Sequence, residues 1–154
     1  MTVVEGLAGA LPSYRVRLDR GAIRRFATAV GATDAVHHDV EAARAAGHPD
    51  LVAPPTYLFG LDLEHGRVFR LLGEAGLDPA SCLHVEQEFA YGSSPHAGET
   101  LVFRPRFVPP PVARRGAMRF VQRRTAVDRS DGEPVAVLRQ LIAVRSSRAG
   151  EEAA

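Results

Sequence analysis

The titratable side chains of one short loop are the residues of this chain best suited to acid–base chemistry. His37, His38 and Asp39 are consecutive, and Asp34 lies three residues before His37. Imidazole and carboxylate groups transfer protons in general acid–base catalysis. Catalytic side chains are often carried by loops that rigid elements hold in place. We therefore treat the stretch from Phe26 to Thr56, which contains this loop, as the candidate site.

A helix start at the end of this stretch offers a second kind of chemistry. The sequence Pro54-Pro55-Thr56 suits a first helical turn, where proline is tolerated although it has no N–H. Thr56 and Tyr57 still offer backbone N–H groups, and the helix dipole favours negative charge at this end. These two amides can polarise a carbonyl oxygen, although residues of a first turn need no such role.

Each loop residue also has an ordinary structural role. His37 can be a loop histidine hydrogen-bonded to a carbonyl, and His38 can be an exposed side chain. Asp34 can bond the backbone of its own turn, and both roles stay open for this residue. Asp39 suits the cap of a following helix, and we assign it to that structural role.

The composition excludes several other classes of function. The formal net charge of +1 provides no field that would draw the chain to nucleic acid or to a membrane. No run of about 18 apolar residues predicts a membrane-spanning helix. The N-terminal residues lack the pattern of a signal peptide. Cys82 is the single cysteine and cannot form an internal disulfide, so a reducing, cytoplasmic setting is expected.

Sequence motifs for metals, nucleotides and nucleophilic serines are absent. The other histidines lack the spacing of metal ligands, and Cys82 has no motif around it. The G-x-S-x-G, P-loop and dinucleotide-binding patterns do not occur. We therefore expect neither a metal nor a cofactor.

The elements that must position these groups begin with a short strand and three helices. Alternating basic and apolar residues predict a strand over 14–18. Apolar residues at helical spacing predict an amphipathic helix between Asp19, its cap, and Gly31. A second short helix follows Asp39. A third helix, from about Pro55, is apolar on most sides, as a buried helix would be.

Strands follow from residue 83 onward. In the segment 83–91, alternation predicts that Val85, Gln87, Phe89 and Tyr91 share one face. In the next strand Pro105 predicts an edge position or a bulge. Two longer strands, 116–128 and 134–145, are joined by a polar turn and should form an antiparallel hairpin.

This order of elements indicates an α+β fold, with an antiparallel sheet wrapped around a long central helix. At 154 residues the chain is long enough to bury a core and is most simply one domain. We expect the domain to span 1–145 and the small, polar residues 146–154 to form a flexible tail.

Two segments resemble one known family. The string FA-x-AVG…VHHD…GHPDLVAPPT, from Phe26 to Thr56, resembles the N-terminal type of MaoC-like dehydratase domain. The segment HVEQEFAYGSSPHAGETLVFRPRF, residues 84–107, resembles the same family, in which a strand carrying Glu or Gln precedes a similar turn. Each piece alone is a weak motif, but together, in this order, they are fairly specific. The family comprises hot-dog-fold (R)-specific enoyl-thioester hydratases and 3-hydroxyacyl-thioester dehydratases.

The resemblance implies active sites at a dimer interface, and so a homodimer or a heterodimer with a related hot-dog chain. It implies a thioester of coenzyme A or acyl carrier protein as substrate, with no nucleic acid or membrane as partner. In catalytic members a loop of the form G-D-x-N-P-x-H-x-D supplies an Asp–His pair. The histidine acts as base, the aspartate helps to protonate, and an amide near the helix start polarises the thioester carbonyl.

The family's roles can be carried over residue by residue. His37 falls on the catalytic histidine, which favours a functional role for it, and Asp39 falls on the capping aspartate. Ala32 falls where catalytic members carry the acid, so that carboxylate is missing, and Asp34 is the candidate replacement. Proline stands where many hydratases have an amide-donating glycine. The implied substrate contacts are His38, Pro55, Thr56, Tyr57 and Phe59.

The leading hypothesis is reversible hydration of trans-2-enoyl thioesters to (3R)-hydroxyacyl thioesters. His37 would move the proton, the Thr56 and Tyr57 amides would hold the carbonyl, and Asp34 or a partner chain would supply the acid. The first alternative is a non-catalytic subunit that binds the acyl chain or stabilises a heterodimeric dehydratase. The second alternative keeps the fold but performs a cyclisation or another elimination.

An arginine cluster on the C-terminal strands has two interpretations. It can dock an acidic carrier protein or coenzyme A phosphates, since guanidinium binds phosphate in a bidentate manner. It can also be the solvated face of a hairpin, which is the commoner outcome. The cluster comprises Arg114, Arg115, Arg119, Arg123 and Arg124.

Overall fold

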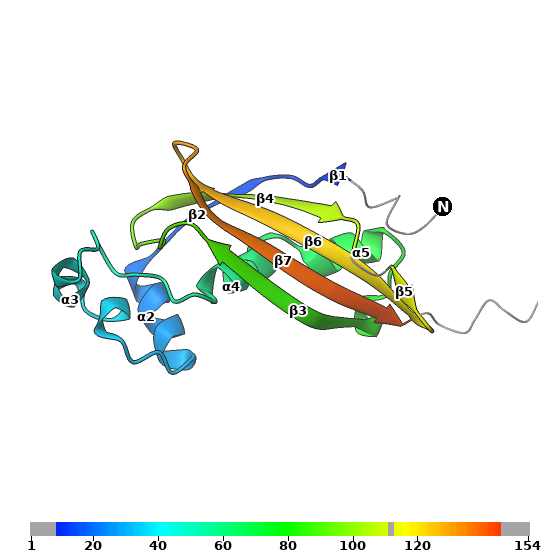
Figure 1. The fold of residues 1–154 in the computed structure, drawn as a ribbon, viewed down its shortest axis with the longest axis horizontal. Coiled ribbons are helices and arrows are strands. Elements are labelled where there is room, and N and C mark those ends of the chain that lie inside the picture. Colours follow the sequence, from blue (N-terminus) through cyan, green and yellow to red (C-terminus); the bar gives the residue numbers. More distant parts are fainter. Residues whose placement is uncertain (1–8, 111–112, 146–154) are drawn as a thin grey trace, which may run out of the picture.

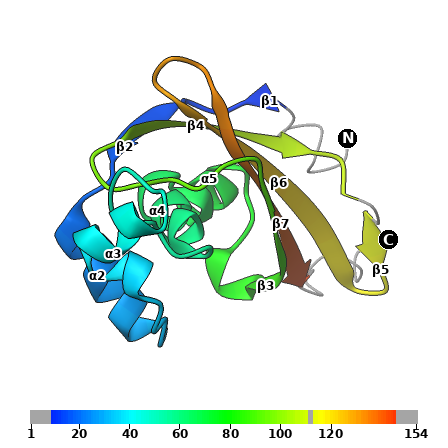
Figure 2. The ribbon, with the colours of Figure 1, turned by 60° about the vertical axis from the view of Figure 1, so that its left-hand side comes forward.

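The structure, a computed structural model, describes residues 9–110 and 113–145 of the chain. A strongly curved antiparallel sheet wraps around two consecutive helices, and two further helices project beyond one end of it (Figures 1 and 2). The predicted α+β hot-dog architecture is confirmed. The predicted tail, 146–154, lies outside the described residues.

The sheet has the strand order β1-β4-β6-β7-β3, and every pairing in it is antiparallel. Strands β1 and β2 pair with the same edge of β4, β1 near its end and β2 near its start. Strand β5 pairs with the start of β6. Strand β3 is last in the order, so one of its edges has no strand partner among the described residues. The bounds are β1 Gly9–Ala10, β2 Tyr14–Arg17, β3 Cys82–Tyr91, β4 Thr100–Val108, β5 Arg114–Arg115, β6 Met118–Arg129 and β7 Pro134–Arg145.

The predicted hairpin is confirmed, since β6 and β7 pair along their length and are joined at residues 130–133. Pro105 lies in β4, opposite the interruption between β1 and β2. Its carbonyl accepts a hydrogen bond from the Leu11 N–H (3.1 Å), so its nitrogen faces the same interrupted side. A proline costs no ladder bond there, as at a sheet edge.

The predicted alternation along β3 is wrong at the start of the strand. The register with β7 shifts between His84 and Glu86, which marks a bulge. Val85 is 53% exposed as a result, although it was expected to share the face of Phe89. Beyond the bulge the alternation holds, because a strand keeps its faces only while its pairing is regular.

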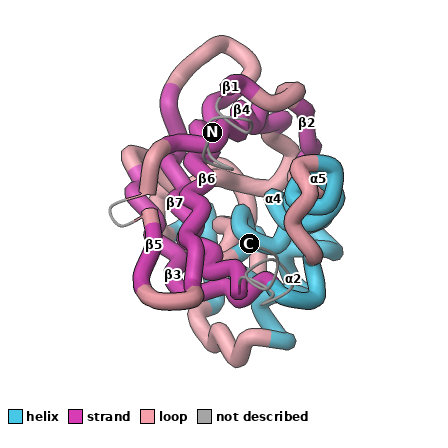
Figure 3. The backbone as a smooth tube through the Cα atoms, turned by 90° about the vertical axis from the view of Figure 1, so that its right-hand side faces the viewer, coloured by secondary structure: helices cyan, strands magenta, loops and turns pink. Residues whose placement is uncertain are grey.

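The three predicted helices lie close to where the sequence places them, and a fourth follows them in the chain. Figure 3 shows the helices and strands of the described residues by colour. Asp19 caps the first helix by accepting a hydrogen bond from the Ala22 N–H (2.8 Å). Two 3-10 turns, Ala35–His37 and Pro79–Ser81, complete the helical elements of the described residues. The helices are α2 Arg20–Ala29, α3 Val40–Ala45, α4 Tyr57–His65 and α5 Val68–Glu74.

The central helix consists of two pieces. Helix α4 ends at Gly66, Arg67 adopts a left-handed conformation with φ of 48°, and α5 starts at Val68. A Cβ atom at Gly66 would overlap the guanidinium of Arg123 and the backbone oxygen of Asp62, so only glycine fits at the break.

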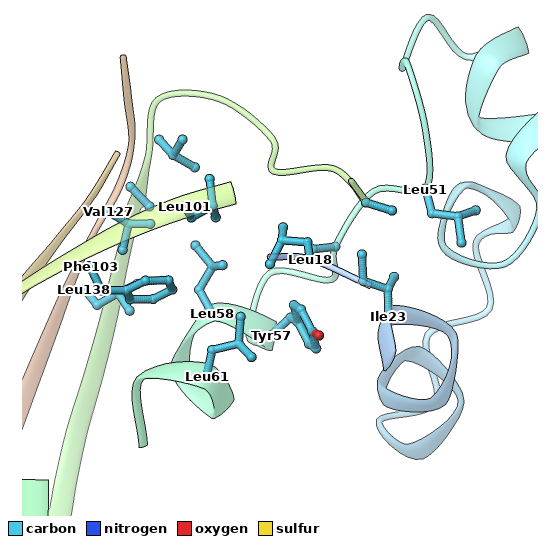
Figure 4. Close-up of a cluster of buried hydrophobic side chains, with 14 residues drawn as sticks. Leu18, Ile23, Leu51, Tyr57, Leu58, Leu61, Leu101, Phe103, Val127 and Leu138 are labelled. Carbon is cyan, nitrogen blue, oxygen red and sulfur yellow. The ribbon is translucent and has the colours of Figure 1, made fainter. Parts of the chain in front are cut away.

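One hydrophobic core joins the sheet to the projecting helices. Leu58 and Leu61 of α4 pack with Phe103 of β4 and Leu138 of β7, as Figure 4 shows. The same cluster continues through Leu18, Ile23 and Leu51 to α2 and the segment before α4. Burial of apolar surface is the main force that stabilises such packing. It holds the loop of His37 between elements that belong to the body of the domain.

Candidate functional site

The backbone fixes the ring of His37. Its Nδ1 lies 2.8 Å from the carbonyl oxygen of Val52, and His37 is partly buried at the end of the 3-10 turn. A carbonyl oxygen only accepts, so Nδ1 must carry the proton. In the neutral ring Nε2 is then the unprotonated nitrogen. The structural role foreseen for His37, a bond to a carbonyl, therefore also prepares the ring to act as a base.

His38 and Asp34 make local contacts in the same loop. The His38 Nε2 lies 2.7 Å from the carbonyl oxygen of Ala32, and Arg24 Nε donates to the carbonyl of His38 (2.7 Å). The exposed Asp34 accepts a hydrogen bond from the Val36 N–H (3.2 Å) and caps the 3-10 turn. One carboxylate oxygen of Asp34 is thus engaged with the backbone.

Asp39 closes the loop as a helix cap. Its carboxylate accepts hydrogen bonds from the N–H groups of Glu41 (2.7 Å) and Ala42 (3.1 Å) at the start of α3. These bonds satisfy amides that have no partner inside the helix. The structural role expected for Asp39 is confirmed.

The two amides predicted at the start of α4 differ. The Tyr57 N–H donates to the carbonyl of Pro54 (2.9 Å), while the Thr56 N–H has no acceptor within the described part of the chain. Pro55 is exposed, and its carbonyl accepts a hydrogen bond from the hydroxyl of Tyr91. Burial raises the pKa of Tyr91, which keeps this hydroxyl protonated. The structure leaves Thr56 as the freer donor.

Phe59 lies on the side of α4 that faces the free sheet edge. Its ring centroid is 5.0 Å from that of His84 and 6.5 Å from that of Phe89, both on β3. On another side of α4, a shallow groove of about 400 Å³ runs along α2. The groove starts at Tyr57, and its lining is mostly apolar: Ala22, Arg25, Phe26, Ala29, Tyr57, Gly60, Leu61 and Glu64.

An internal ion pair between α4 and β6 was not predicted. Asp62 of α4 and Arg123 of β6 are 2% and 1% exposed, and their side chains form an ion pair. The hydroxyl of Thr125 donates to the same carboxylate (3.0 Å), as does that of Tyr14. Burial and the Asp62 carboxylate raise the pKa of Tyr14. A lone aspartate in an otherwise apolar helix was the signal in the sequence.

The arginine cluster loses one member in the structure. Arg123 faces the interior, which contradicts its assignment to a surface cluster. Its strand neighbour Arg124 points to the other face, because successive residues of a strand alternate. Arg114, Arg115 and Arg119 are exposed, as a solvated or docking surface requires.

The described residues show neither a metal-binding cluster nor a membrane-spanning helix. Within residues 9–110 and 113–145 no three His, Cys, Asp or Glu side chains gather in a way that could hold a metal ion. Over the same residues no helix has the length and apolarity needed to cross a membrane.

Comparisons with known proteins give the family. A family model described as "FAS1-like, dehydratase domain region" matches residues 11–138. A UPF0336 protein of Saccharopolyspora erythraea is 32% identical over 136 residues, which cover 88% of this chain and 85% of that protein. A UPF0336 protein of Streptomyces coelicolor is 37% identical over 90 residues, or 58% of this chain and 60% of the relative. The chain thus spans about three fifths of several curated relatives.

Solved structures give the fold. A chain of the HadBC (3R-hydroxyacyl-ACP dehydratase) complex from Mycobacterium tuberculosis matches with a TM-score of 0.74 and 25% identity, over 87% of this chain and 92% of that chain. A MaoC-like dehydratase matches with a TM-score of 0.80 and 20% identity, over 94% of this chain and 44% of that one. The chain therefore belongs to the FAS1-like dehydratase-region family and has the hot-dog fold of the MaoC-like dehydratases.

Proposed function

We propose that this chain takes part in the reversible hydration of trans-2-enoyl thioesters to (3R)-hydroxyacyl thioesters, carried by coenzyme A or acyl carrier protein. The observation that carries the proposal is the 2.8 Å contact between His37 Nδ1 and the Val52 carbonyl. It leaves Nε2 as the basic nitrogen of a partly buried ring, in a member of a dehydratase family.

His37 is the general base of this proposal. In the hydration direction Nε2 removes a proton from water, and the resulting hydroxide adds to the β-carbon of the enoyl group. In the dehydration direction the same ring returns that proton to the leaving hydroxyl. Base catalysis of this kind contributes about 10²- to 10⁴-fold to a rate.

The Thr56 N–H holds the thioester carbonyl. Negative charge develops on that oxygen when the β-carbon is attacked, so a fixed donor lowers the barrier. Thr56 is exposed at the start of α4, where the helix dipole also favours negative charge. The groove between α2 and α4 begins at the next residue and offers an apolar surface to the acyl chain.

The acid that protonates the α-carbon comes from Asp34 or from a partner chain. Ala32 provides no carboxylate, and Asp34 is already the cap of the 3-10 turn. HadBC is a complex of 3R-hydroxyacyl-ACP dehydratase subunits, and this chain resembles one of its chains. A second hot-dog chain with an intact Asp–His pair would complete the site.

The free edge of β3 is the surface we assign to that partner. Leu83 and Val85 are 56% and 53% exposed there, and an unpaired edge with apolar side chains is a template for strand pairing. Val85→Lys places a charge on the edge. We expect it to abolish dimer formation, measured as loss of the dimer mass in light scattering. Circular dichroism should show that the chain stays folded. An unchanged mass would reject this edge as the interface.

Turnover of crotonyl-coenzyme A tests the activity. We expect the chain, alone or with a co-expressed hot-dog partner, to hydrate this substrate. The loss of enoyl absorbance measures the rate. His37→Ala should lower the rate by at least about 10²-fold. His65→Ala changes a histidine at the end of α4 and is the control. Equal rates for the parent chain and His37→Ala, in every pairing, would sink the role of His37.

A non-catalytic subunit is the second candidate, and the position of Asp34 favours it. One carboxylate oxygen of Asp34 is bonded to the backbone, and Ala32 stands where catalytic members of the family carry the acid. In that case the chain binds the acyl group, and the partner performs the chemistry. Activity that appears only with the partner, and that survives His37→Ala, would identify this role.

A further inference from the structure

Two histidines that the proposed mechanism does not use meet close to the segment that holds His37. His48 Nδ1 lies 3.1 Å from His96 Nε2, a hydrogen-bond distance, although 48 positions separate them in the chain. His48 follows α3, and His96 lies in the turn between β3 and β4. His96 is 8% exposed and His48 is partly buried, so the contact lies at the border of the interior.

The short segment from Leu51 to Ala53 lies between His37 and this pair. On one side the Val52 N–H donates to the Val36 carbonyl (3.0 Å), and the Val52 carbonyl accepts from His37. On the other side Val52 forms a β-bridge with His96. The segment also exchanges two backbone bonds with the His96 turn: Ala53 N–H to Pro95 carbonyl and Ala97 N–H to Leu51 carbonyl, both 2.9 Å.

The turn that carries His96 is itself fixed by charge. Glu99 accepts the His96 backbone N–H through Oε2 (2.8 Å) and the Nε of Arg129 through Oε1 (2.8 Å). Arg129 ends β6, so these bonds attach the turn to the sheet. The hydrogen bond between the histidines attaches the chain after α3 to the same anchored turn.

We propose that His48 and His96 are positioning residues for His37: their hydrogen bond fixes the Leu51–Ala53 segment, and with it the carbonyl that selects the His37 tautomer. The inference rests on the proposed role of His37 as a base. A backbone carbonyl can orient a ring only if the carbonyl itself is held, and the segment is held from the His96 side.

The hydrogen bond between the two rings needs at least one neutral imidazole, because one nitrogen must accept. A second proton removes the acceptor and places two positive charges 3.1 Å apart. The charged groups that face His96 are His48, Glu99 and Arg129, and Glu99 is already paired with Arg129. Burial lowers the pKa of His96, so in the folded chain its ring stays neutral to a lower pH than a free imidazole. Acid should therefore open this contact.

The tautomer of His37 is the direct measurement. Long-range ¹H–¹⁵N spectra of the imidazoles in the full-length chain at pH 7.5 distinguish Nδ1–H from Nε2–H rings without any substrate. We expect one tautomer, Nδ1–H, for His37 in the parent chain. His48→Leu, on the more exposed side of the contact, should convert it to a mixture. His96→Gln keeps a neutral hydrogen-bonding group near the Nε2 position and should preserve the single tautomer.

Controls keep the proposal falsifiable. His65→Leu lies outside the pair and should leave the His37 signals unchanged. A folded His48→Leu chain with His37 still in one tautomer would overturn the inference. If hydratase activity is found, His48→Leu should lower kcat more than it raises KM. The conservative variant His96→Gln should keep kcat close to that of the parent chain. If the chain shows the expected spectra but no hydratase activity, either alone or with a co-expressed hot-dog partner, the proposed function is rejected and the positioning role is kept.

Discussion

The carboxylate of Asp62 and the guanidinium of Arg123 form an ion pair in the interior, between the central helix α4 and strand β6. Two hydroxyl groups, of Tyr14 and Thr125, complete the shell of the carboxylate. The helix at whose start the Thr56 amide lies is thus attached to the sheet by polar as well as apolar contacts. This attachment sets the position of that amide relative to the sheet.

We expect Arg123→Met to destabilise the fold by about 3–5 kcal/mol, because it leaves the Asp62 carboxylate buried without its cation. Chemical denaturation of the full-length chain measures this change. The matched control is Glu74→Ala, which breaks the exposed pair of Arg70 and Glu74 and should cost no more than about 0.5 kcal/mol. Similar losses for the two variants would contradict the internal role of the pair.

Glycines 60 and 66 should respond in opposite ways to alanine. At Gly66 a Cβ would overlap Arg123 and Asp62, so Gly66→Ala should weaken the fold. At Gly60, within α4, the nearest atom to a Cβ is Phe26 Cε2 at 3.8 Å, which is an ordinary contact. Gly60→Ala should therefore stabilise the fold by about 0.5–1 kcal/mol through helix propensity. Thermal melts of both variants test this contrast.

Gly60 also lies in the groove between α2 and α4, so the same variant tests substrate binding. We expect Gly60→Ala to raise KM for enoyl thioesters while the chain becomes more stable. A more stable chain with unchanged kinetics would show that the acyl group does not use this groove.

Stability should fall in mild acid because of His96. Its pKa is lowered by burial from the usual 6.5, so the unfolded chain binds the proton more readily than the folded chain. The stability associated with neutral His96 is therefore complete above pH 6.5 and declines as the pH falls toward the lowered value. His96→Gln removes this titrating side chain. It should therefore make the free energy of unfolding depend less on pH in that window. Equal slopes for parent and variant would contradict the assignment.

Asp34 can be tested separately as cap and as acid. Asn keeps a side-chain oxygen for the Val36 N–H, whereas Ala does not. If Asp34 is the acid, Asp34→Asn should retain stability and lose activity, and Asp34→Ala should lose both. If a partner supplies the acid, Asp34→Asn should keep full activity in the complex. Steady-state kinetics with crotonyl-coenzyme A, beside thermal melts, distinguish these results.

The sequence predicted the fold well because its elements carry local signals. Asp19 and Asp39 cap the helices they precede, and the apolar helix after Pro55 lies inside the sheet. The bulge near Val85 was missed because a register shift depends on the partner strand. The placement of Arg123 was missed because its exposure depends on Asp62, which is 61 positions away.

The candidate site was predicted only in part, for the same reason. The loop and its residues could be named, but the contact between His37 and Val52 depends on where a distant backbone segment passes. The pairing of His48 with His96 has no spacing rule that a sequence could show. The engagement of the Tyr57 amide with Pro54 likewise depends on the shape of one turn.

The contact that prepares His37 uses a main-chain oxygen, and every amino acid at position 52 supplies one. Natural variation and saturation mutagenesis at this position should therefore follow only the size and apolar character that the buried Val52 side chain needs for packing. Isoleucine, alanine or cysteine there should keep His37 in the Nδ1–H form. A function encoded in this way is nearly invisible to residue-matching methods, because the group that matters has the same formula in all twenty amino acids.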